Sequence, residues 1–200
     1  MAQGDVIDRL VGIEPGSHLD TIRTTRPQTR DNAQASFDAL FRPVETGDVS
    51  LEERCALALF VSGLHGSEPA GAFYAGLLEA DPEKGGLVDK VRSEIRLAAA
   101  EGPAGHYPEG PLRPESTDGP TYRVGADRRT GLGARLSAAF DHAHMLVYRP
   151  REAAPEALQV LLQAGWTTTG IVTISQIVAF LAFQLRVVSG LRALAAAPRS

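Results

Sequence analysis

The segment Asp48–Gly66, DVSLEERCALALFVSGLHG, constrains the fold more than any other part of the chain. Ser50, with Glu53 three residues later, matches a capping box, in which two side chains satisfy free amides at a helix start. From Cys55 to Val61 the residues are almost continuously apolar. We therefore expect a helix that begins at Ser50 and is buried on most of its sides.

The remaining sequence predicts further helices separated by proline and glycine. Strand signals are nearly absent, because no segment alternates apolar and polar residues between turns. We expect helices over 31–41, after a cap at Ser67, over 86–100, up to Pro150, and from Pro155 to Gly165. The helix over 86–100 should bury a stripe formed by Leu87, Val88, Val91, Ile95 and Leu97. The last and most apolar helix should be broken or frayed near Gly170 and should end around Gly190.

Two hundred residues, of which 44% are apolar, are enough for one domain with a proper core. We expect a single all-α domain over residues 1–200, with an N-terminal arm at 1–30. Residues 101–126 hold five prolines and five glycines and show no helical period. They predict a long loop that joins two helical halves, and loops of that length are often functional.

Charge and cysteine content restrict the partners and the compartment. The net charge is −4 with no block of like charge, so we expect neither a nucleic-acid partner nor a membrane surface. The longest apolar run of the last helix, Ile177–Phe183, is far shorter than the ~20 residues that cross a bilayer. The N-terminal residues lack the apolar core of a signal peptide. A single cysteine fits a reducing cytosol, so we expect a soluble, cytoplasmic protein.

Three groups of residues invite a chemical interpretation. His142 and His144 are two residues apart, so on a helix they point in nearly opposite directions and cannot share a metal ion. We expect no metal site, and His142 as a partly exposed side chain or, alternatively, a proton-shuttling residue beside Asp141. Cys55 lies among aliphatic residues, which favours an inert thiol with a raised pKa. Ser67 lacks the setting of a nucleophile elbow and is most simply a helix cap.

Two segments resemble one known family. LEERCALALFVSGLHGSEPAGAFYAGLL is similar to the core helix pair of the carboxymuconolactone decarboxylase / alkylhydroperoxidase D-like superfamily, and LQVLLQAGWTTTGIVTISQIVAFLAFQLRVVSGLRAL resembles the C-terminal part of its peroxidase-related members. The resemblance implies an alkylhydroperoxidase D-like helical bundle. It also implies a homo-oligomer, as a dimer, trimer or hexamer.

Peroxidase members of that family use a Cys-x-x-Cys pair with a downstream His and an upstream Glu, and this chain lacks the pair. In one register Ser67 and Ala70 take the two sulfur positions, Tyr74 the histidine position and Cys55 the glutamate position. In a second register, which keeps Glu53 as the acid, His65 and Glu68 take the sulfur positions and Ala72 the histidine position. Neither register restores a dithiol, so the resemblance implies a scaffold without the family's redox centre and without a cofactor.

Three functions therefore remain open. The first is binding of a small apolar or carbonyl-bearing molecule, with acid–base chemistry by His65, Glu68 and Tyr74. The residues that could line its pocket are Glu53, Cys55, Ser67, His142, Trp166 and Gln176. The second is a non-enzymatic partner subunit of a thiol-bearing paralogue. The third is a one-cysteine hydroperoxidase that uses Cys55. For the glutamines of the last helix, Gln176 and Gln184, structural hydrogen bonds are the simpler interpretation.

Overall fold

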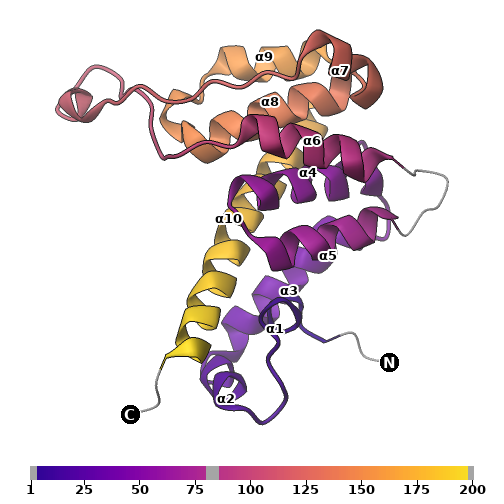
Figure 1. Cartoon of the computed structure of the whole chain (residues 1–200), viewed down its shortest axis with the longest axis vertical. Helices are drawn as coiled ribbons and strands as arrows, with labels where there is room; N and C mark the ends of the chain where they lie inside the picture. The colour runs from indigo at the N-terminus through magenta and orange to yellow at the C-terminus, as the bar shows by residue number, and fades with distance from the viewer. Residues whose placement is uncertain (1–3, 80–85, 198–200) are drawn as a thin grey trace.

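The computed structural model describes residues 4–79 and 86–197. Over these residues the regular structure is helical, which confirms the all-α class (Figure 1). The α-helices are α1 (Val6–Val11), α2 (His18–Thr24), α3 (Pro27–Phe41), α4 (Leu51–Leu64), α5 (Glu68–Glu79), α6 (Leu87–Ala98), α7 (Ala126–Leu132), α8 (Ala134–Tyr148), α9 (Pro155–Gln163) and α10 (Thr168–Ala196).

Helix α4 is the centre of the fold. The predicted capping box is confirmed, because Ser50 Oγ accepts from the Glu53 amide and the Glu53 carboxylate accepts from the Ser50 amide. The predicted apolar run Cys55–Val61 is buried throughout. α4 contacts α5, α6, α8 and α10, so apolar residues around its whole circumference find partners. Gly63 permits the close approach of α6, since a Cβ there would lie 2.6 Å from Ile95.

The last helix differs from its prediction. α10 runs without a break from Thr168 to Ala196, so the expected break near Gly170 and end around Gly190 are both wrong. Thr167 caps the helix by accepting from the Gly170 amide, which places Gly170 in the first turn rather than at a break. Beyond Gly190 the sequence LRALAA consists of strong helix formers, and their propensity outweighs a single glycine.

Two other predictions need correction. α3 begins at Pro27, four residues before the expected start, because proline is well suited to the first helical position. On α6 the predicted stripe holds for Val88 and Val91, but Leu97 is exposed. The acidic Glu94 lies on the buried face instead, where Tyr122 and Arg128 are its partners.

The helices before and after the long connection share one core. In Figure 1, α7–α9 lie above α4–α6, α1–α3 form the lower part, and α10 passes from the upper to the lower group. α10 packs against α3 and α4, which precede the connection, and against α8, which follows it. The connection over 101–125 is irregular except for the 3-10 helix η2 (Arg113–Glu115) and one bridge between Gly105 and Thr117.

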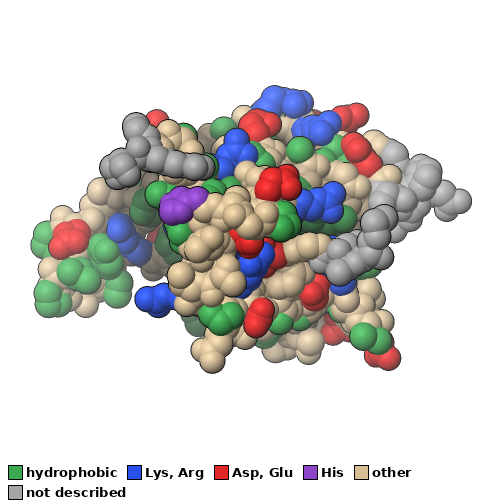
Figure 2. All heavy atoms as spheres, turned by 90° about the horizontal axis from the view of Figure 1, so that it is seen from below, with side chains coloured by type: hydrophobic (Ala, Val, Ile, Leu, Met, Phe, Trp, Pro, Cys, Tyr) green, Lys and Arg blue, Asp and Glu red, His purple; other side chains and the backbone are tan. Residues whose placement is uncertain are grey.

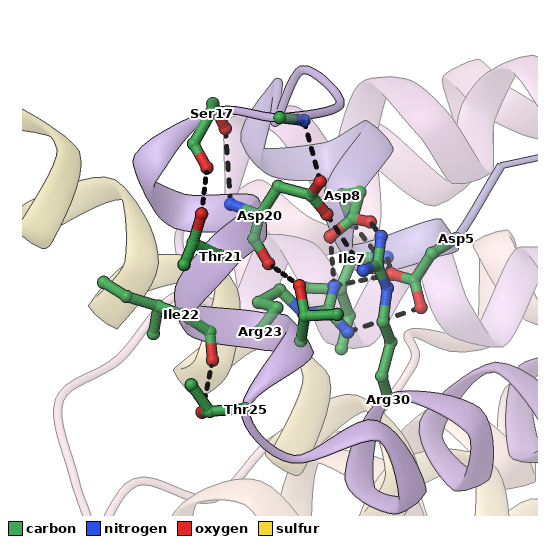
Figure 3. Close-up of polar contacts among 12 residues, drawn as sticks. Asp5, Ile7, Asp8, Ser17, Asp20, Thr21, Ile22, Arg23, Thr25 and Arg30 are labelled. Atoms are coloured by element: carbon green, nitrogen blue, oxygen red, sulfur yellow. Dashed lines mark hydrogen bonds and ion pairs between the residues drawn. The ribbon is translucent and has the colours of Figure 1, made fainter.

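The segment expected as an N-terminal arm is folded over its described part, while residues 1–3 lie outside the described residues. α1 buries Val6, Ile7 and Leu10 in the core. A group of five charged residues, here called the Asp–Arg network, joins α1, α2 and α3 (Figure 3). Its members are Asp5, Asp8, Asp20, Arg23 and Arg30.

Among the described helices, α10 is the one whose length and composition would allow it to cross a membrane. Half of its most apolar window is buried inside the protein. The buried part packs against α3, α4 and α8, and these contacts account for the apolar residues that it contributes to the core.

Candidate functional site

A sharp corner between α4 and α5 carries three of the polar residues that the sequence singled out, His65, Ser67 and Glu68. His65 caps α4, and its amide donates to the Val61 carbonyl. Gly66 follows with φ +64°, a left-handed conformation that glycine adopts without strain, so the chain can turn at once. Ser67 then precedes α5, which begins at Glu68. The corner thus places an imidazole beside the N-terminus of a helix.

This corner and the C-terminal half of α10 enclose a cavity of about 330 Å³, here called the His65 cavity. α10 contributes two arginines and a serine as well as apolar side chains, so the cavity combines positive charge with apolar wall. Neither arginine has an ion-pair partner in the described part of the chain. The lining residues are His65, Gly66, Ser67, Pro69, Leu185, Arg186, Val188, Ser189 and Arg192.

The imidazole of His65 is held in its neutral form. Its Nε2 atom is buried and has no hydrogen-bond partner in the described protein. Burial lowers the pKa of His65, and the charge of Arg186 lowers it further. A neutral imidazole with a free ring nitrogen can accept a proton or a hydrogen bond from a bound molecule.

The structure does not bring the three predicted acid–base residues together. Tyr74 is fully buried, and its hydroxyl donates to Gln184 Oε1 at 2.8 Å. Burial raises the pKa of Tyr74 far above its ordinary value. Glu68 is exposed and lines a different cavity, of about 310 Å³, beside Arg92 and Arg96 of α6. Of the three predicted acid–base residues, His65 is therefore the one that lines the His65 cavity, and Tyr74 is a core residue.

Of the predicted pocket-lining residues, Ser67 alone lines the same cavity as His65. Glu53 pairs with Arg135 at 2.9 Å, and Trp166 stacks under the same guanidinium, with 4.0 Å to the ring centroid. Gln176 is exposed on α10. Cys55 is buried in the core, where desolvation raises its pKa to about 11 and disfavours the thiolate that peroxide chemistry requires.

His142 differs from its expected exposure. It is only 6% exposed and, with Asp141, lines a small cavity of about 60 Å³ under α9. The prediction of a partly exposed histidine is therefore wrong, because α9 and the connection before α7 cover that face of α8. Burial lowers the pKa of His142, and its Nδ1 has no partner. Asp141 accepts from the Val124 amide and pairs with Arg129, so it is already satisfied.

Sequence reasoning missed several buried charged groups, of which Glu94 is the least exposed. Glu94 is 1% exposed, and it bonds Tyr122 Oη and, at 2.6 Å, Arg128 Nε. A signal was present, because Val91, Glu94 and Ala98 are spaced by three and four residues and so share one face of a helix. The structure also reveals Arg186 and Arg192 as the cations beside His65, since only the fold brings α10 to the corner.

No group of three His, Cys, Asp or Glu side chains in the described residues could hold a metal ion. A scan of the sequence against protein-family models finds no match, and a search of curated proteins finds no significant relative. The functional argument therefore depends on the geometry of the His65 cavity.

Proposed function

We propose that the His65 cavity binds a small organic molecule that carries a carboxylate or a related oxyanion, and that His65 exchanges a proton with it. The proposal rests on one coincidence at this cavity: within the described residues the buried Nε2 of His65 has no hydrogen-bond partner, and Arg186 and Arg192 have no ion-pair partner. Buried polar atoms normally have hydrogen-bond partners, so a free one beside a cavity indicates a place for a ligand.

The chemistry follows from the charges. Arg186 and Arg192 suit an oxyanion, because a guanidinium can donate two parallel hydrogen bonds to it. Leu185, Val188 and Pro69 offer apolar contact to a carbon skeleton. When a bound molecule gives its proton to the neutral imidazole of His65, the arginines stabilise the negative charge that remains on the molecule.

Benzoate and its neutral analogue benzamide test the proposal. We expect benzoate to shift the backbone amide resonances of Gly66 and Ser67 saturably in NMR spectra, and benzamide to bind more weakly. The bound anion offsets the field of Arg186, so the pKa of His65 should rise on binding. Arg186→Gln and Arg192→Gln should weaken benzoate binding, whereas Arg113→Gln, in the distant η2, should not. Equal binding of both compounds, or unchanged binding by both arginine variants, would contradict the proposal.

A second candidate, a non-enzymatic subunit of a larger assembly, is favoured by one observation. α9 exposes Leu158 and Leu162, each to about 40%, four residues apart on one face of a helix of nine residues. Exposed apolar side chains gathered in this way are typical of protein contacts.

Sedimentation of the pure chain separates self-assembly from assembly with a different partner. A homo-oligomer that Leu158→Glu dissociates supports self-assembly, a monomer that binds a thiol-bearing paralogue supports the partner subunit, and a monomer without such binding contradicts both.

A further inference from the structure

A second concave surface lies at the opposite end of the fold from α9. The C-terminal half of α10 runs beside α2 and α3 in the lower part of Figure 1. Between them is a groove of about 270 Å³, here called the α2–α10 groove. Its apolar wall comes from four helices and consists of Ile7, Ile22, Ala33, Phe183, Val187 and Leu191.

The charges of the Asp–Arg network are already neutralised inside the protein. Arg23 pairs with Asp5 and Asp8, and Arg30 pairs with Asp8 and Asp20 (Figure 3). Both arginines line the groove, so their aliphatic stems add to its wall while their guanidinium groups are held by carboxylates. They therefore contribute apolar surface to the groove but little net charge.

Arg26 provides the free charge of the groove. It is exposed, lines the groove, and has no ion-pair partner among the described residues. Thr29 lies three residues later, in the first turn of α3, and also lines the groove. No acidic residue of the described chain lines the groove, and the first turn of α3 contains none. The surrounding face carries interspersed charges of both signs (Figure 2), so this local excess is specific to the groove.

We propose that the α2–α10 groove binds an unbranched aliphatic carboxylate, with its hydrocarbon chain against α10 and its carboxylate at Arg26 and Thr29. An uncharged hydrocarbon would gain nothing from the exposed Arg26 guanidinium, and an aliphatic cation would meet like charge. A volume just below that of ordinary ligand cavities suits one chain of moderate length rather than a larger ligand. This site is separate from the His65 cavity and shares no lining residue with it.

A chain-length series provides the test. Hexanoate, octanoate and decanoate should bind by calorimetry with an affinity that rises about threefold to fourfold per added methylene until the groove is full. Octan-1-ol should bind more weakly than octanoate, because it lacks the charge that Arg26 complements. NMR shifts of amides in α2 and in residues 183–191 should identify the groove. Equal affinity for octanoate and the alcohol would overturn the proposal.

Variants separate this site from other sources of affinity. Arg26→Gln should weaken octanoate binding about threefold to fivefold, as for an exposed ion pair, whereas Arg113→Gln should leave it unchanged. Leu191→Trp should abolish binding by filling the groove, with an unfolding curve to show that the variant is folded. Octanoate binding should survive His65→Asn, and its loss there would assign the ligand to the other cavity. Binding to neutral phosphatidylcholine vesicles, with none to free octanoate, would also refute the proposal.

Discussion

The Asp–Arg network and the His65 cavity both concentrate charged residues between helices, but their charges are balanced differently. In the network every arginine has at least two carboxylates, and the side chain of Arg23 is only 8% exposed. In the His65 cavity Arg186 and Arg192 have no carboxylate partner among the described residues, and His65 has a free buried nitrogen. The first arrangement joins three helices, and the second leaves hydrogen-bonding capacity for a molecule outside the chain.

The largest effect should come from breaking the balanced network. Asp8→Ala removes the carboxylate that pairs with both arginines and leaves Arg23 buried with Asp5 alone. We expect the free energy of unfolding to fall by about 3 kcal/mol in a denaturant titration, because a buried charge loses a partner. Asp38→Ala, which breaks an exposed pair with Arg42, should cost less than about 1 kcal/mol.

Arg186→Gln is the matched test at the other site. Its guanidinium is exposed and donates to the Ala182 carbonyl, and no carboxylate of the described residues pairs with it, so its removal should change the free energy of unfolding by less than about 0.5 kcal/mol. A loss as large as that of Asp8→Ala would show that Arg186 is a structural residue and would remove the contrast between the two regions.

Acid should lower the free energy of unfolding through the buried histidines. Burial lowers the pKa of His144 to about 4, and the pKa values of His65 and His142 are lowered as well. The unfolded chain takes up these protons near pH 6.5 and the folded chain does not, so stability falls as the pH drops from 7 to 5. His144 alone should account for about 2 kcal/mol at pH 5.

Unfolding measured across this pH range checks the assignment. His144→Asn should flatten the dependence on pH, whereas Asp8→Ala should lower stability and leave that dependence in place, because it removes none of the buried histidines. In the Asp–Arg network, hydrogen bonds from the Gly16 amide and from Arg30 lower the pKa of Asp20, so this carboxylate keeps its charge as the pH drops from 7 to 5. An unchanged slope in His144→Asn would contradict the role given to burial.

A smaller effect than that of the buried histidines concerns Tyr74, which the sequence placed with His65 and the structure places in the core. Tyr74→Phe removes the donor to Gln184, whose Nε2 already lacks a partner. We expect a loss of about 1 kcal/mol in the free energy of unfolding, and the double variant with Gln184→Leu should recover part of it. Benzoate binding should be unaffected, and its loss in Tyr74→Phe would return Tyr74 to the site.

The sequence predicts local features better than long-range neighbours. The capping box of Ser50 and Glu53 is confirmed because it depends on residues three apart. The burial of Cys55 is also confirmed, since its aliphatic neighbours imply it. His65 and Ser67 line one cavity, because they adjoin the same helical corner. The exposure of His142 was predicted wrongly, since the elements that cover it come from distant parts of the chain.

The sequence by itself determined that the chain is all-α, that α4 is its buried centre, and that a corner follows His65. These properties depend on helical periodicity, caps and glycine, which act over a few residues. Only the tertiary structure decided that Arg186 and Arg192 lie beside His65, that Tyr74 bonds Gln184, and that Glu68 faces α6. Those contacts join residues up to 127 positions apart, as for His65 and Arg192, and packing of whole helices, rather than any local pattern, selects which side chains meet.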